Sequence, residues 1–186
     1  DKVIEKIGSV GRPQLLTEVR IVDRDGRDVA DGEAGELLIR GPNITPGYWN
    51  RPDATAEAIE AGGWLHSGDV ARRDDDGFYY IVDRWKDMYI SGGENVYPAE
   101  VEKALEQHPA IAEVAVVGIA DERWGEVGKA CYVLRPDSQV DEDALRAHCR
   151  ERLAGYKVPK VFQCLPALPR NALGKVTKQE LRNGAE

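Results

Sequence analysis

The run IAEVAVVGI, residues 111–119, constrains the fold of this chain more than any other stretch of the sequence. Apart from Glu113 and Gly118, its residues are all apolar. A strand with one side in water alternates between apolar and polar residues, whereas a nearly continuous apolar run is typical of a strand that is covered on both faces. The segments around this run must therefore provide cover on two sides.

The sequence on either side of the run predicts this cover. Residues 91–109, SGGENVYPAEVEKALEQHP, predict a glycine loop and then a helix that has Pro98 in its first turn and ends at Pro109. Residues 129–136, KACYVLRP, predict a second strand, which the loop ADERWGEVG joins to the first.

The rest of the chain extends the same pattern. Asp141 is expected to cap a second helix, with an apolar face, that ends near Gly155. A further strand is expected over residues 160–166 and a helical turn over residues 177–182. Together these elements predict a compact α+β domain of about a hundred residues, a size that can fold alone.

Residues 1–84 predict strands with little to cover them. TEVRIVDRDGRDV predicts a hairpin about the Asp25–Gly26 turn, and residues 35–41 and 77–84 predict two more strands. RPDATAEAIEAGG predicts one short helix that ends at Gly62–Gly63. Such a set seldom closes a core alone, so we expect it to belong to a larger structure. The predicted fold class is α+β: a β-rich subdomain over 1–84, followed over 85–186 by a small α+β domain with a short sheet flanked by helices.

Composition excludes several classes of function. The net charge of -8 argues against a general affinity for nucleic acid or acidic membranes. No apolar run approaches the roughly eighteen residues that a membrane helix needs, so no transmembrane segment is expected. The three cysteines and three histidines follow no metal-ligand spacing, and we expect no metal site made by this chain. We interpret the cysteines as reduced and buried and the protein as cytoplasmic; the cysteines are Cys131, Cys149 and Cys164.

The stretch PRNALGKVT, residues 169–177, contains a glycine–lysine pair of the kind that holds phosphate. A phosphate loop would need a glycine five residues before Gly174 and a Ser or Thr after Lys175, and this chain has Pro169 and Val176 there. The surrounding segment is basic, with Glu180 as its one acid between residues 155 and 182. These residues alone fit either a solvated surface or a contact with a polyanionic ligand.

Three stretches carry a resemblance to a known family. They are GYWNRPDAT, residues 47–55; GGWLHSGDVARRDDDGFYYIVDRWKDMYISGGENVYPAEVE, residues 62–102; and LPRNALGKV, residues 168–176. In this order they resemble the adenylate-forming superfamily of acyl- and aryl-CoA synthetases, peptide-synthetase adenylation domains and firefly luciferase. The resemblance covers nearly the whole chain and is strongest to ligases of fatty or aryl acids.

The resemblance implies that the chain is a C-terminal piece. The family's phosphate loop, acid pocket and acidic magnesium ligand are not among these 186 residues. Residues 1–84 would then be the β-rich end of a large N-terminal domain, and residues 85–186 the small mobile domain. The missing N-terminal domain is the expected partner, and the fragment alone is expected to be inactive.

The implied activity is that of an AMP-forming acid–thiol ligase. A carboxylic acid and ATP with Mg²⁺ would give an acyl-adenylate, and coenzyme A would then displace AMP to form a thioester. The acid itself cannot be read from the sequence, because the pocket that selects it is absent. Two alternatives stay open: an adenylation domain that loads a carrier protein, and a non-catalytic fragment that binds nucleotide or a partner domain.

The resemblance assigns roles to particular residues. Lys175 would stabilise the anionic carboxylate and α-phosphate as they react, and Asp69 would accept the two ribose hydroxyls. Arg84 and Asn95 would also contact the nucleotide. Lys86 would be the hinge about which the small domain swings between the two steps.

After the swing, a second set of residues would line the coenzyme A tunnel. The turn at Gly92–Gly93 would let the backbone pass close to the pantetheine chain, and Trp124 would lie near the nucleotide of coenzyme A. Tyr156 and Lys157 would present an aromatic ring and a base there. Val158 departs from relatives that carry a further base at this place.

Overall fold

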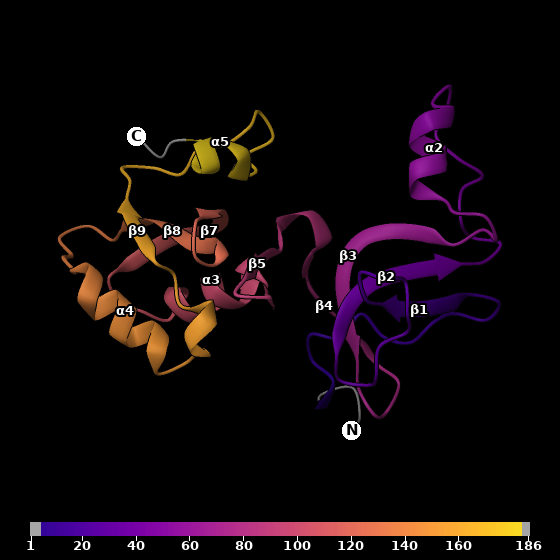
Figure 1. The fold of residues 1–186 in the computed structure, drawn as a ribbon, viewed down its shortest axis with the longest axis horizontal. Coiled ribbons are helices and arrows are strands. Elements are labelled where there is room, and N and C mark those ends of the chain that lie inside the picture. Colours follow the sequence, from indigo (N-terminus) through magenta and orange to yellow (C-terminus); the bar gives the residue numbers. More distant parts are fainter. Residues whose placement is uncertain (1–4, 184–186) are drawn as a thin grey trace. The chain divides into compact units, whose positions relative to one another are not determined.

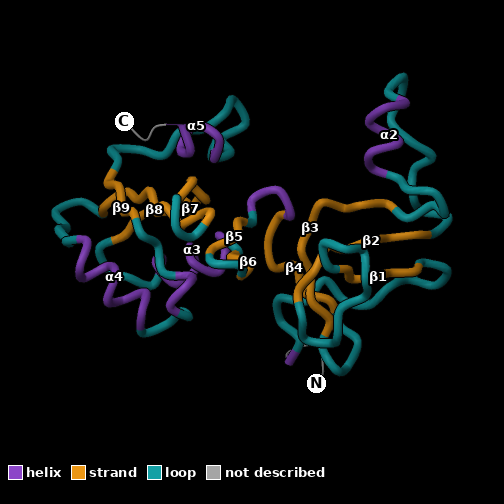
Figure 2. The backbone as a smooth tube through the Cα atoms, in the orientation of Figure 1, coloured by secondary structure: helices purple, strands orange, loops and turns teal. Residues whose placement is uncertain are grey.

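The computed structural model describes residues 5–183, which form helices, strands and short loops (Figures 1 and 2). The chain folds as two compact units that divide between Lys86 and Asp87, within the short 3₁₀ helix η1 (Trp85–Asp87). Each unit has its own sheet.

In the first unit, four antiparallel strands lie in sequence order: β1 (Glu18–Val22), β2 (Ala34–Arg40), β3 (Leu65–Arg73) and β4 (Tyr79–Arg84). One face of this sheet forms a small core, whose buried members are Ile21, Leu37, Ala71 and Tyr79. The helix α2 (Pro52–Ala58) has no buried residue. This unit therefore matches the β-rich set that the sequence predicted, with a core of few side chains.

Two local predictions in this unit were wrong. The polar strand expected after Asp25–Gly26 is only an isolated bridge, because the Asp23 carboxylate accepts the N–H groups of Asp25 and Arg27 and draws the backbone into a turn. The helix α2 ends at Ala58 instead of Gly62–Gly63, since Ile59 is extended and bridges to Leu65.

The strand β3 was missed. The sequence around Gly68 suggests a turn, and Gly68 does have a positive φ of 70°. The chain nevertheless continues as a strand through this point, and its register against β4 shifts between Val70 and Ala71. A strand with such an irregularity lacks the regular alternation by which a pattern is recognised.

The second unit contains five strands: β5 (Tyr89–Ser91), β6 (Glu94–Val96), β7 (Ile111–Asp121), β8 (Gly125–Leu134) and β9 (Val161–Cys164). The strand β7 pairs antiparallel with β8 along the whole length of β8. The strand β5 pairs with β8 near the start of β8, and β9 pairs in parallel with the centre of β8. The helices are α3 (Pro98–Glu106), α4 (Glu142–Arg150) and α5 (Lys178–Asn183), with a 3₁₀ turn η2 (Gly155–Lys157).

The apolar run in β7 is covered on both faces, as predicted. Val116 belongs to the core that α3 and α4 cover, whereas Ala115 and Val117 pack on the opposite face with Leu168 and with Leu181 of α5. Figure 1 shows α5 on one side of this sheet and α3 and α4 on the other. The α+β class is confirmed for this unit, and so is the Asp141 cap, whose carboxylate accepts the Ala144 N–H at 2.7 Å.

Four details differ from the prediction. The connection between β7 and β8 is a tight turn, because pairing continues to Asp121 opposite Gly125. The expected glycine loop at 91–95 is a hairpin of β5 and β6. The helix α4 ends at Arg150, before Gly155. Cys164 is exposed, because it ends β9, which pairs with β8 alone among the described strands; Cys131 and Cys149 are buried.

A tyrosine fits against two glycines at the centre of this unit. Gly118 of β7 and Gly128 of β8 lie directly opposite each other. A Cβ atom on Gly118 would be 2.4 Å from the Cβ of Tyr89, and one on Gly128 would be 2.3 Å from its hydroxyl oxygen. The Tyr89 side chain therefore fills the space that both glycines leave, and it anchors β5 to the β7–β8 pair. Its hydroxyl is buried without a hydrogen-bond partner among residues 5–183.

Candidate nucleotide and thiol sites

The first group of site residues is built by strand pairing. Asp69 of β3 lies opposite Arg84 of β4, and the Arg84 Nε is 3.1 Å from the Asp69 carboxylate. The Asp69 N–H donates to the Ser67 hydroxyl at 3.1 Å. Both side chains are partly exposed, and an ion pair of this kind contributes little to stability. The arrangement instead places a carboxylate and a guanidinium side by side where a polar ligand can reach them.

Lys86 follows this pair closely in the chain. It lies in η1 and its residue is exposed. The boundary between the two compact units comes directly after it.

In the second unit, Gly92 and Trp124 lie against each other. Gly92 and Gly93 form the β5–β6 turn with φ of 62° and 89°, a backbone conformation that other residues rarely adopt. The Gly92 N–H donates to the Trp124 carbonyl at 3.0 Å, and a Cβ on Gly92 would be 2.8 Å from the indole ring. Two features therefore favour glycine at position 92: its positive φ, and the indole ring that leaves no room for a Cβ atom.

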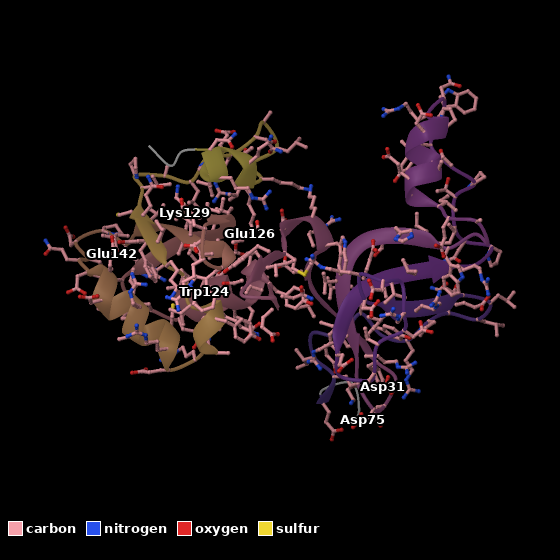
Figure 3. All side chains as sticks on the ribbon, viewed as in Figure 1. Asp31, Asp75, Trp124, Glu126, Lys129 and Glu142 are labelled. Atoms are coloured by element: carbon pink, nitrogen blue, oxygen red, sulfur yellow. The ribbon has the colours of Figure 1, made fainter. Side chains whose placement is uncertain are left out.

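Contacts within its own turn hold Trp124 in place. The Asp121 carboxylate accepts the N–H groups of Arg123 and Trp124, each at 2.9 Å. The Arg123 guanidinium lies 4.8 Å from the indole ring centre. Glu126, labelled with Trp124 in Figure 3, accepts the Ile90 N–H at 3.0 Å and so ties β5 to β8. The Trp124 residue is still 40% exposed, which leaves part of the aromatic surface open to a ligand.

Tyr156 and Lys157 lie on η2, which packs near β6. The Lys157 ammonium bonds to both carboxylate oxygens of Glu100 at 2.7 Å, and its side chain is 19% exposed. A base expected to contact a coenzyme A phosphate is thus already paired with an acid. Asn95 is half-buried on β6, opposite Ile90 of β5.

Lys175 lies on a closed turn that precedes α5. The Asn171 N–H donates to the Lys175 carbonyl at 2.9 Å, and the Gly174 N–H donates to the Asn171 carbonyl at 2.9 Å. The Asn171 side-chain oxygen accepts the N–H groups of Leu173 and Lys175, each at 3.0 Å. Gly174 has a φ of 78°, which suits its place in the turn. Among the residues described here, the exposed Lys175 ammonium has no ion-pair partner.

The predicted residues therefore form separate groups. Asp69 and Arg84 meet in the first unit, whereas Gly92 and Trp124 meet in the second. The turn of Lys175 lies on the α5 face of the second sheet, opposite α3 and α4 (Figure 1). Among residues 5–183 there is no cluster of three or more His, Cys, Asp or Glu that could hold a metal, and no helix there is long and apolar enough to cross a bilayer.

Comparison with known proteins identifies the family. Residues 1–49 match the AMP-binding enzyme family, and residues 100–175 match the AMP-binding enzyme C-terminal domain. The feruloyl-CoA synthase of Amycolatopsis sp is 53% identical over 97% of this chain and 36% of its own length. The chain belongs to the adenylate-forming family.

Solved structures of adenylate-forming enzymes have the same fold. The o-succinylbenzoate CoA synthetase of Bacillus subtilis, solved with its acyl-adenylate intermediate, is 44% identical over 98% of this chain and 36% of its own, with a TM-score of 0.85. The amide bond synthetase McbA of Marinactinospora thermotolerans is 36% identical over 98% of this chain and 37% of its own, with a TM-score of 0.86. This chain spans about a third of the length of these relatives.

The sequence predicted candidate ligand-binding residues for this adenylate-forming chain but did not indicate the residues that contact and support them. Asp121 accepts N–H groups of the Trp124 turn, Glu126 ties β5 to β8, Glu100 pairs with Lys157, and Arg170 bonds to the Lys175 turn. Glu126 and Glu100 bond to groups 36 and 57 residues away, so no local pattern indicates them. Arg170 is four residues from Gly174, but its second partner, Glu113, is 57 residues away. The Asp121 contact, three residues before Trp124, could have been found as a side-chain-to-backbone turn.

Proposed function

We propose that this chain is the C-terminal part of an AMP-forming acid–thiol ligase. Residues 1–84 would end the large adenylating domain, and residues 85–186 would form the small mobile domain. The observation that carries the proposal is the 53% identity to a feruloyl-CoA synthase over 97% of the chain. The whole enzyme would convert a carboxylic acid and ATP to an acyl-adenylate and pyrophosphate. It would then transfer the acyl group to coenzyme A and release AMP.

In the first half-reaction, Asp69 and Lys175 would have different tasks. The Asp69 carboxylate has acceptor oxygens for the paired ribose hydroxyls, and its neighbour Arg84 adds a donor for ribose or phosphate. The Lys175 ammonium would lie between the attacking carboxylate and the α-phosphate, both of which are anionic. A preorganised donor at such a place contributes about 3–4 kcal/mol to the transition state.

In the second half-reaction, the turn at Gly92–Gly93 would face the pantetheine chain. The open side of Trp124 and the exposed Tyr156 would face the nucleotide of coenzyme A. Lys157 would contribute less than a free base, because it would have to leave Glu100 to reach a phosphate. Asn95, on the neighbouring strand β6, would contact phosphate in one of the two steps.

Magnesium would enter with ATP. The described residues offer no cluster of metal donors, so we propose that its protein ligand comes from the part of the enzyme beyond this chain. A cytosolic location likewise stays a prediction.

The named relatives suggest which acids to test first. Feruloyl and o-succinylbenzoate groups are both aromatic, so we propose an aryl acid as the substrate class. The likeness to an amide bond synthetase favours a second candidate, in which an amine replaces the thiol in the second step. The full-length enzyme, offered coenzyme A, a carrier protein and an amine in separate reactions with one acid, distinguishes these nucleophiles by its product. No product with any of them, and no pyrophosphate release with any acid, would favour the non-catalytic alternative.

The decisive experiment separates the two half-reactions. In the full-length enzyme, Lys175→Ala should slow adenylate formation from acid and ATP by about 10²–10³-fold. Thioester formation from supplied acyl-adenylate and coenzyme A should persist. The control Lys103→Ala removes an exposed lysine of α3 and should leave both steps unchanged. Equal loss of both steps in Lys175→Ala would contradict domain alternation, and loss of neither would contradict the catalytic assignment.

Asp69 and Lys86 allow two further checks. Asp69→Ala should raise the ATP concentration needed for half-maximal adenylation, because charge-assisted hydrogen bonds worth about 1.5–3 kcal/mol are lost. Lys86→Pro fixes φ near -65° and should preserve one half-reaction while the other collapses. An unchanged ATP requirement would remove Asp69 from the ribose site, and two unchanged half-reactions would place the pivot elsewhere.

A further inference from the structure

We propose that Arg170 is a positioning residue for Lys175. Its guanidinium joins the carbonyl directly before Lys175 to strand β7, and so fixes the direction in which the lysine leaves its turn. The proposal rests on the catalytic role proposed above for Lys175.

The guanidinium of Arg170 has two partners. One terminal nitrogen donates to the Gly174 carbonyl at 2.8 Å, and the other donates to the carboxylate of Glu113 on β7. The Gly174 carbonyl belongs to the peptide group that carries the Lys175 N–H. One side chain therefore connects the peptide before the catalytic lysine to the sheet.

The other bonds of the turn are internal. The Asn171 side chain accepts two N–H groups of the turn, and backbone bonds close it between Asn171 and Lys175. These bonds determine the shape of the turn, but they do not attach its tip to another element. Arg170 is thus the described contact that ties the tip to β7, while Arg170 and Val176 bridge at its base.

The segment after the turn is attached separately. The Lys178 ammonium lies 2.8 Å from the carboxylate of Glu102 on α3, which also accepts the Val116 N–H of β7. The buried Lys129 of β8, labelled in Figure 3, donates to the Leu181 carbonyl at 3.1 Å. Loss of Arg170 should therefore loosen the turn and leave α5 in place.

The effect of Arg170 should fall on rate more than on folding. Its side chain and that of Glu113 are 44% and 46% exposed, and exposed ion pairs add little to stability. A misplacement of about 1 Å in a catalytic group can, however, slow a reaction about 100-fold. Lysine cannot replace the planar fork that serves two acceptors at once, because it is a single point charge.

The test uses the full-length enzyme with Arg170→Ala, Arg170→Lys and Glu113→Gln. Arg170→Ala should slow single-turnover adenylate formation by about 10–100-fold, with little change in the KM values for acid and ATP. Arg170→Lys and Glu113→Gln should each reduce the rate of adenylate formation less than Arg170→Ala does. Thioester formation from acyl-adenylate should be unchanged in all three variants. The control is Arg152→Ala, because Arg152 also bonds to one carbonyl and one carboxylate, those of His148 and Glu151, but not to the turn.

A second measurement needs no activity. In ¹⁵N relaxation of the 186-residue chain, Arg170→Ala should lower the backbone order parameters of residues 172–175 from about 0.85 toward 0.6, with β7 and α5 unchanged. An unchanged adenylation rate, or a turn that stays rigid, would overturn the proposal. If the wild-type enzyme forms no adenylate, the proposed function fails, and the relaxation data still decide whether Arg170 orders the turn. If Arg170→Ala does not fold, Glu113→Gln gives both readouts.

Discussion

The contact between Tyr89 and Gly128 makes a quantitative prediction about stability. In Gly128→Ala the new Cβ would lie 2.3 Å from the tyrosine hydroxyl oxygen, about 1 Å closer than an ordinary contact. Overpacking of this kind costs about 1–3 kcal/mol, and the lower entropy of alanine in the unfolded chain offsets about 0.4–1 kcal/mol. We expect Gly128→Ala to reduce the free energy of unfolding of the second unit by about 1–2 kcal/mol.

Removal of the hydroxyl should abolish this loss. In Tyr89→Phe the nearest atoms to the new Cβ are the ring carbon at 3.2 Å and the Pro159 Cα at 3.4 Å, which a small shift can accommodate. The hydroxyl is buried without a described partner, so its loss alone should be neutral or stabilising. The double-mutant cycle should therefore give a coupling free energy of about 1–2 kcal/mol between the two positions.

Gly118→Ala is the matched control. Its Cβ would lie 2.4 Å from the Tyr89 Cβ and 2.8 Å from Cγ, atoms close to the backbone of β5 that cannot move away. It should destabilise the unit equally with Tyr89 or Phe at position 89. The assay is urea unfolding of the 186-residue chain, read by pulsed hydrogen exchange of β7 and β8 peptides so that the first unit does not contribute. The same cost of Gly128→Ala in both backgrounds would refute the reasoning.

Three further predictions concern the cap, a histidine and the thiols. Asp141→Ala should lower the free energy of unfolding by about 0.5–2 kcal/mol, because the cap of α4 is lost, whereas Asp143→Ala should not; urea unfolding measures both. Burial and nearby positive charge lower the pKa of His108 below 6.5, so its contribution is present above pH 6.5 and is lost as pH falls through the lowered pKa. The urea concentration at the unfolding midpoint should therefore decrease as the pH is lowered below 6.5, and it should decrease less in His108→Gln. A thiol reagent should modify only Cys164 in the native chain, since burial raises the pKa of the other two thiols, to about 11 for Cys149; modification of a second thiol would contradict this.

The sequence by itself determined the features that depend on near neighbours. The apolar run at 111–119 required a strand covered on both faces, and the structure covers it on both. Asp141 and Pro98 predicted helix starts because capping and the first helical turn involve residues only a few positions apart. The motifs also identified the family and named residues such as Lys175, whose roles stay predictions.

Only the tertiary structure decided which residues meet. Asp69 and Arg84 face each other because of the β3–β4 register, which includes an irregularity that no periodic pattern shows. The glycines at positions 118 and 128 are explained only by Tyr89, which comes from a third strand and fills the space beside them. Arg170 ties the Lys175 turn to the sheet only because β7 brings Glu113 beside the turn. The physical reason is that caps and turns depend on local backbone geometry, whereas register and packing depend on contacts between segments distant in the chain.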